Sequence, residues 1–255
     1  LTTFNPITVT CPANSTVCLY DAAFALSGGM PTGGTYSGTG VSANMCNPAT
    51  AGVGTHTITY AYTAPSGCMN SCTFTITVNP TPTVNQPGNQ VLCNGDMTTA
   101  VTFSGVVPGT VFNWTNNTTS IGLAASGTGD IAAFTATNIT SGPVVATITV
   151  TPSYTAGGTT CFGAPKTFTI TVNPTPTVND PTDQLVCNGA STSVTFSGFV
   201  AGTVYSWTND NASIGLGTSG TGDIPTFTAT NATDDIVIAN LTVTPTYTNA
   251  GVTCT

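Results

Sequence analysis

The sequence predicts an all-β fold, built as tandem antiparallel β-sandwich domains. The stretch Thr-Phe-Thr-Ile-Thr-Val-Asn-Pro-Thr-Pro-Thr-Val-Asn occurs twice without a change, at Thr73–Asn85 and Thr167–Asn179. Apolar residues alternate with threonine in its first half, which is the period-2 pattern of a half-buried strand. Thr, Gly, Ser, Asn, Val and Pro dominate the whole chain, and this composition favours strands and turns over helices.

The prolines inside this stretch predict stiff joints between domains. Proline has no N–H group and keeps the preceding residue extended, so the strand stops at Asn-Pro-Thr-Pro. We expect joints at Pro80 and Pro82 and at Pro174 and Pro176, with the next strand starting at Val84 in the first case. The predicted domains are therefore residues 1–80, 81–174 and 175–255, the last without its closing strand.

The second and third domains are two copies of one repeat. Equivalent residues include Cys93 and Cys187, Trp114 and Trp207, and Cys161 and Cys254. We expect the two tryptophans to anchor the two cores. Strand candidates recur between turn signals, as in a sandwich, and the one at 144–151 and its copy at 237–244 alternate well enough to be central. The candidates in the second domain are Gln90–Cys93, Ala100–Ser104, Thr110–Trp114, Ala132–Thr137, Val144–Thr151 and Lys166–Val172.

The charge balance excludes several classes of partner. Only 4% of the residues are charged, the net charge is −8, and Lys166 is the sole cation apart from His56. Nucleic acids and anionic membrane surfaces require many Lys and Arg residues, so neither is expected as a partner. No apolar run is long enough for a membrane-spanning helix, so no membrane insertion is expected either. Nine cysteines in so polar a chain indicate an oxidising compartment.

The positions of the cysteines predict one disulfide in each copy of the repeat. Cys93 and Cys161 in one copy match Cys187 and Cys254 in the other. Each pair would tie the first strand region to the far end of its own domain. In the chain-entropy account, closing such a loop contributes about 4 kcal/mol.

Several runs in the chain resemble repeats of very large bacterial surface proteins. Residues 31–41 and 51–60 resemble Ig-like repeats of Bacteroidota proteins, and residues 10–14 with 71–78 resemble hyalin-type repeats. The two later domains resemble PKD-like repeats, including those of gliding-motility adhesins. This resemblance implies export by the type IX secretion system and display on the outer membrane.

The resemblance also implies disulfides in the first domain. The hyalin-type pattern pairs Cys11 with Cys72, and the Ig-like pattern pairs Cys18 with Cys68. Cys46 is then left over, and we expect a buried thiol there in preference to a cross-link with a neighbouring molecule. The sequence alone leaves these pairings open.

Catalytic and metal-binding chemistry have little support. The chain has no glutamate, its aspartates are scattered, and the two repeats contain no histidine, so no enzyme is expected. His56 is interpreted as a residue on a strand face. Asp130 and Asp223, in matching Ser-Gly-Thr-Gly-Asp-Ile loops, are the best candidates for a Ca²⁺ site. One carboxylate per loop is too few, so we favour turn hydrogen bonds and expect no cofactor.

These observations favour a structural and adhesive stalk at the cell surface. Its expected partners are neighbouring repeats and a surface glycan or substratum. One alternative is a carbohydrate-binding module that uses exposed aromatic residues, with candidates Tyr20, Tyr36, Tyr60 and Tyr62. Another is a homopolymer in which Phe4–Thr10 of one chain fills the missing strand of another.

Overall fold

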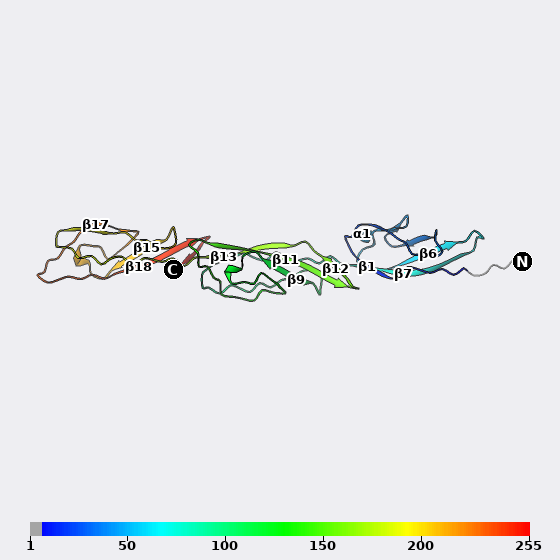
Figure 1. Cartoon of the computed structure of the whole chain (residues 1–255), viewed down its shortest axis with the longest axis horizontal. Helices are drawn as coiled ribbons and strands as arrows, with labels where there is room; N and C mark the ends of the chain where they lie inside the picture. The colour runs from blue at the N-terminus through cyan, green and yellow to red at the C-terminus, as the bar shows by residue number, and fades with distance from the viewer. Residues whose placement is uncertain (1–6) are drawn as a thin grey trace.

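The computed structural model describes residues 7–255 and is an all-β chain drawn out into a rod (Figure 1). We call residues 7–80 unit 1, residues 81–174 unit 2 and residues 175–255 unit 3. Each has its own hydrophobic core cluster, and no cluster takes residues from two units. None of the helices in the described part is long and apolar enough to cross a membrane.

The repeated stretch forms the strand that closes units 1 and 2. In unit 2, β13 (Lys166–Asn173) buries Phe168, Ile170 and Val172 and leaves the threonines between them less covered. In unit 1, β7 (Met69–Asn79) does the same with the identical residues Phe74, Ile76 and Val78. Both strands end at the asparagine that precedes the joint, as the prolines predict. No strand follows at Val84, although its side chain is buried in the core of unit 2.

Each closing strand lies between two others. In unit 2, β13 pairs antiparallel with β11 (Val144–Ala156) and parallel with β8 (Gln90–Cys93). In unit 1, β7 pairs antiparallel with β6 (Gly54–Thr63) and parallel with β1 (Ser15–Cys18). The predicted class of antiparallel β-sandwich domains is confirmed, except that the first strand of units 1 and 2 pairs parallel with the closing strand. Because of the parallel pairing, the first strand ends at the same end of the unit as the closing strand.

The main sheet of unit 2 has the order β10-β9-β11-β13-β8, in which β10 is Ser126–Thr128. β12 (Thr159–Phe162) pairs with the far half of β11. As predicted, β11 is central, between β9 (Val111–Asn116) and β13. The candidates at 100–104 and 132–137 form only isolated bridges, Val101 with Ile131 and Met97 with Thr135. Trp114 of β9 is buried, as expected of a core anchor.

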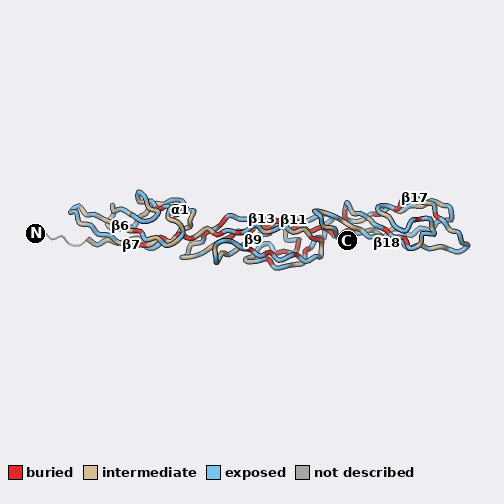
Figure 2. The backbone as a smooth tube through the Cα atoms, turned by 180° about the vertical axis from the view of Figure 1, so that it is seen from behind, coloured by how far each residue is buried: buried red, intermediate tan, exposed pale blue. Residues whose placement is uncertain are grey.

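Unit 3 repeats this sheet up to β18 (Leu241–Asn249), which pairs with β15 (Val204–Asn209) and β19 (Val252–Cys254). No strand of the described residues takes the place that β13 has in unit 2. The segment 184–187, which matches β8, is exposed and belongs to no strand. Buried residues, shown in red in Figure 2, run through the middle of the rod.

The remaining elements are short. They are β2 (Phe24–Ala25), β3 (Thr35–Gly38), β4 (Val41–Ser42), β5 (Met45–Cys46), α1 (Pro48–Ala51), η1 (Thr119–Ile121), β10 (Ser126–Thr128), β14 (Ser191–Val194), η2 (Ala212–Ile214), β16 (Ser219–Thr221) and β17 (Ile224–Thr228).

Candidate functional site, the junctions between units

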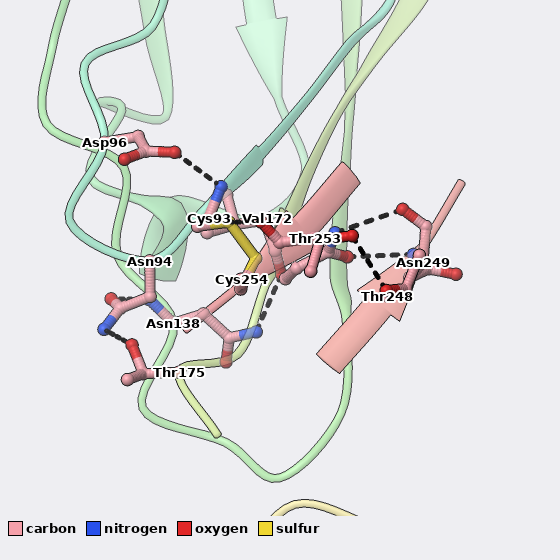
Figure 3. Close-up of a disulfide and its surroundings, with 11 residues drawn as sticks. Cys93, Asn94, Asp96, Asn138, Val172, Thr175, Thr248, Asn249, Thr253 and Cys254 are labelled. Carbon is pink, nitrogen blue, oxygen red and sulfur yellow. Dashed lines mark hydrogen bonds between the residues drawn. A yellow bond between two sulfur atoms is a disulfide. The ribbon is translucent and has the colours of Figure 1, made fainter. Parts of the chain in front are cut away.

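Two of the three disulfides cross from one unit to the next. Cys18 at the end of β1 bonds Cys161 in β12, with 5.6 Å between the Cα atoms. Cys93 at the end of β8 bonds Cys254 in β19, also at 5.6 Å (Figure 3). In both junctions the first strand of one unit is joined to the terminal hairpin of the following unit. The junctions are therefore covalent as well as packed.

The disulfides expected within a repeat are wrong. Cys93 bonds Cys254 instead of Cys161, and Cys187 is free. The reason lies in the parallel pairing, because Cys93 lies opposite Asn173, at the end of β13 that leads into unit 3. Cys161 precedes β13 and lies at the opposite end of unit 2.

In unit 1, Cys11 bonds Cys72, the pair that the hyalin-type pattern implies. The pair Cys18–Cys68, implied by the Ig-like pattern, is wrong, since Cys18 bonds Cys161 and Cys68 is free. Cys46 is also free, and its side chain is 1% exposed.

Asparagine side chains add hydrogen bonds across both junctions. Asn79 ends the closing strand of unit 1, and its Nδ2 donates to the carbonyl oxygen of Ala156 at 2.9 Å. Asn173 ends the closing strand of unit 2, and its Oδ1 accepts from Nδ2 of Asn249 at 2.9 Å. Asn79 and Asn173 are buried, so their amides need these partners. The last residue of the repeated strand thus links neighbouring units.

The joint prolines pack into these junctions. Pro82, Pro174 and Pro176 are buried, and Pro80 is half-buried. In the first junction, a Cβ added at Gly157 would lie 2.4 Å from Oγ1 of Thr16, so the hairpin of unit 2 rests directly on β1. In the second, Nδ2 of Asn94 donates to Oγ1 of Thr175 inside the joint at 3.0 Å. Both joints are covered by residues of the units they connect.

Aspartates beside the first-strand cysteines hold the chain in place. Oδ2 of Asp96 accepts from the backbone N–H of Cys93 at 3.0 Å, and Oδ2 of Asp21 accepts from that of Cys18 at 2.8 Å. Neither aspartate was a candidate functional residue from the sequence. The shared spacing of cysteine and aspartate was the signal that Cys18 and Cys93 are equivalent.

The two candidate Ca²⁺ ligands accept backbone hydrogen bonds from a distant segment of their own unit, rather than within their own turn as expected. Oδ1 of Asp130 accepts from the backbone N–H of Phe103, and Oδ1 of Asp223 accepts from that of Phe196, both at 2.9 Å. No group of three or more His, Cys, Asp or Glu side chains among residues 7–255 is placed to share a metal ion. His56 is half-buried on β6, where its Nε2 lies 2.8 Å from the carbonyl oxygen of Gly52.

The four candidate tyrosines do not form an exposed row. Tyr60 is 1% exposed, and its hydroxyl donates to the carbonyl oxygen of Pro31 and accepts from the N–H of Gly34. Tyr36 packs against it with ring centroids 4.7 Å apart. Tyr62 is half-buried and Tyr20 is exposed. The structure uses Tyr36 and Tyr60 to fill the interior of unit 1.

The free thiols differ in reactivity, and this difference is testable. Burial raises the pKa of the Cys46 thiol, which keeps it protonated at neutral pH, whereas Cys187 is exposed. Since only the thiolate is alkylated, we expect iodoacetamide to modify Cys187 in the native protein and Cys46 only after denaturation. Mass spectrometry of the alkylated peptides checks this order. Equal modification of the two residues in the native protein would show that the core around Cys46 is open.

Comparison with known proteins supports the class of fold. Residues 3–78 match the family described as HYR domain, which confirms the hyalin-type resemblance of the first domain. No curated protein matches the chain significantly.

Solved structures that resemble the chain are tandem arrays of Ig or cadherin domains. Sidekick-1 immunoglobulin domains 1–5 are 14% identical, with a TM-score of 0.35, over 91% of this chain and 58% of that one. Protocadherin gammaB7 EC3-6 is 16% identical, with a TM-score of 0.39, over 86% of this chain and 64% of that one. Mouse Cadherin-23 EC22-24 is 12% identical, with a TM-score of 0.35, over 92% and 90%. By its own sheets the chain is an all-β protein of tandem β-sandwich units, and the HYR family model matches the first of them.

Proposed function

We propose that this chain is a load-bearing segment of an adhesive stalk at a bacterial cell surface. The observation that supports the proposal best is the pair of disulfides across the two junctions. A disulfide inside a unit would protect only that unit, whereas these bonds hold each unit to the next. Three disulfides in one chain are typical of an extracellular protein. The stalk has a structural role and catalyses no reaction.

The disulfides would limit how far the chain extends under tension. With all three bonds intact, the shortest covalent path runs from Leu1 to Cys11, across to Cys72, along to Cys93 and across to Cys254. At about 3.4 Å per extended residue, this path is about 120 Å long, against about 860 Å for the reduced chain. Most of the chain would therefore carry no tension even if the units opened.

The polar composition suits this role. Thr-rich outward faces remain hydrated without charge, and Lys166 is the only Lys or Arg in the chain. A trypsin-like protease would therefore find one cleavage site. The gliding-motility adhesin resemblance agrees with such a stalk, and attachment to the outer membrane through type IX secretion is part of the same proposal.

Single-molecule stretching between the two termini tests this function. We expect the oxidised protein to stop extending at about 120 Å and the protein in dithiothreitol to reach about 860 Å. The Cys187→Ser variant is the matched control, because Cys187 forms no disulfide in the chain and should leave both lengths unchanged. Equal extension with and without reductant would rule out the load-bearing role of the disulfides.

A further inference from the structure

The two ends of the rod present the two halves of one more junction. Each internal junction joins a first-strand cysteine to a hairpin cysteine of the next unit. In unit 3 the first-strand cysteine is Cys187, which is equivalent to Cys93 and is free and exposed. By analogy with the internal junctions, its partner would be a hairpin cysteine of another unit.

Cys68 occupies that hairpin position in unit 1. Thr59 pairs with Thr73 on β7 as Thr149 pairs with Thr167 on β13, so β6 and β11 can be aligned residue by residue. Ala64 is as many residues beyond Thr59 as Tyr154 is beyond Thr149. The alignment therefore places Ala64 at the position of Tyr154.

The residues opposite Ala64 and Tyr154 are both cysteines. Tyr154 lies opposite Cys161, and the N–H of Ala64 donates to the carbonyl oxygen of Cys68 at 2.9 Å. Cys68 is thus the counterpart of Cys161 and Cys254, and it is free. It lies at the tip of the β6–β7 hairpin, at the N-terminal end of the rod (Figure 1).

Unit 3 also has an open seam one strand wide. The seam lies between the segment 184–187 and residues 237–243, which match the two neighbours of β13 in unit 2. Ile148 lies on β11 next to β13 and is fully buried, whereas its counterpart Leu241 is 38% exposed. Leu92 is 8% exposed and its counterpart Val186 is 41% exposed. The seam is therefore an uncovered strip of core rather than an ordinary sheet edge.

Both walls of the seam are held in place without a strand between them. Nε2 of Gln184 donates to the carbonyl oxygen of Ser193 at 3.1 Å, as that of Gln90 does to Thr99 in unit 2. On the other wall, the N–H of Asn240 donates to Oδ1 of Asp210 at 2.7 Å. Each wall is thus fixed by residues of unit 3 itself.

An asparagine side chain beside the seam has a hydrogen-bond donor that, in unit 2, binds the closing strand. In unit 2, Nδ2 of Asn138 donates both to Gly142 and to the carbonyl oxygen of Val172 on β13 (Figure 3). In unit 3, Nδ2 of the matching Asn231 donates only to Asp235. One hydrogen of this amide is left for an incoming strand.

We propose that the end of unit 3 receives unit 1 of a second copy of this chain, head to tail, with a disulfide between Cys187 and Cys68. Unit 1 of the second copy would lie against the Cys187 end of the seam. The donor strand expected at Phe4–Thr10 is not available as a whole, because Thr10 bridges Met30 of its own unit. Residues 1–6 lie outside the described part.

Bond formation needs an oxidant. Two S–H bonds break and one S–S bond forms, while a small disulfide such as oxidised glutathione takes up the two electrons and the two protons and becomes two thiols. The contact is head to tail and uses different surfaces on each copy, so it can be repeated from copy to copy, and between elongated rods this repetition builds a filament.

Two complementary variants of the full chain test the proposal. Cys68→Ser keeps Cys187, and Cys187→Ser keeps Cys68, so neither can form the cross-bond alone. In a glutathione redox buffer we expect a ladder of covalent oligomers from the unmodified protein on a non-reducing gel. Each variant alone should remain monomeric. An equimolar mixture should give dimers, at least ten times more than either variant alone, and nothing larger.

Labelling one variant with ¹⁵N shows which copies are linked. The expected dimer contains one peptide with Cys68 from one isotope and one with Cys187 from the other. Dimers of Cys68→Ser alone at the level of the mixture would overturn the proposal, because Cys187 would then be bonding without regard to its partner. Monomers in the mixture would overturn it as well, and the free cysteines would then serve a unit of another chain. Circular dichroism confirms that both variants are folded.

This proposal extends the stalk function but can fail separately from it. If no oligomer forms while the stretching experiment still shows the short extension of the oxidised chain, the internal junctions stand and only the assembly is wrong. If oligomers form but the extension is the same with and without reductant, the assembly stands and the load-bearing role is wrong.

Discussion

Replacing Cys93 and Cys254 with serine is expected to destabilise unit 3 strongly, because it removes the disulfide that holds this unit to unit 2. The bond closes a loop with a sequence separation of 161, and removing it should lower the free energy of unfolding of unit 3 by about 3–5 kcal/mol. Unit 3 depends on this bond because its core cluster has only the four buried residues Phe196, Trp207, Leu216 and Ile224. For comparison, the cluster of unit 2 has fifteen.

Limited proteolysis at increasing temperature measures this effect on unit 3 separately from units 1 and 2. Chymotrypsin should cut the double variant within residues 175–255 at temperatures where the unmodified protein resists. Cys187→Ser is the matched control, since Cys187 is equivalent to Cys93 but unbonded. If the control were cleaved as readily as the double variant, loss of a cysteine side chain, rather than loss of the bond, would account for the effect.

Replacing Trp114 with alanine is expected to have the largest effect of a single change. Trp114 is 7% exposed and lies on β9, which pairs with β10 and β11. Its Nε1 donates to the carbonyl oxygen of Gly129 at 3.2 Å. A Cβ added at Gly127 would lie 2.3 Å from the indole, so the ring lies flat against β10. Truncating a buried tryptophan costs about 3–5 kcal/mol, a large share of the stability of a domain this size.

A matched pair of milder variants separates packing from hydrogen bonding. Trp207 lies in the same position of unit 3, against Gly220, but its Nε1 has no acceptor. Trp114→Phe loses ring area and a hydrogen bond, whereas Trp207→Phe loses ring area and removes an unsatisfied donor. We therefore expect Trp114→Phe to cost about 1 kcal/mol more, measured by urea-dependent proteolysis within the unit that carries the change. Equal costs would mean that the hydrogen bond of Trp114 contributes nothing.

Local patterns predicted the strands well where the alternation was strong. β8 has the predicted bounds, β13 is one residue longer than predicted, and both closing strands end at the residue before the joint proline. The candidates at 100–104 and 132–137 failed because each contributes one residue to an isolated bridge, Val101 to Ile131 and Thr135 to Met97. A strand needs a partner along its length, and the sequence of one segment does not show how far the partner follows it.

The disulfide partners could not be predicted because the sequence did not reveal the direction of the first strand. Matching cysteines in two repeats show that a bond recurs, but they do not distinguish a bond within a repeat from one between neighbours. The parallel pairing of β8 with β13 places Cys93 and Cys161 at opposite ends of unit 2 and so decides the question. The odd number of cysteines in the first domain was a sign that one of them bonds outside it.

Disulfide mapping by mass spectrometry tests the central claim most directly. Trypsin has one site in this chain, so we would digest the unreduced protein with pepsin, at an acid pH that suppresses thiolate exchange. The account predicts one linked peptide pair that contains Cys18 and Cys161, and another that contains Cys93 and Cys254. Both pairs should disappear on reduction. A linked pair that contains Cys93 and Cys161 would contradict the account, because each unit would then be closed on itself and the junctions would be free to bend.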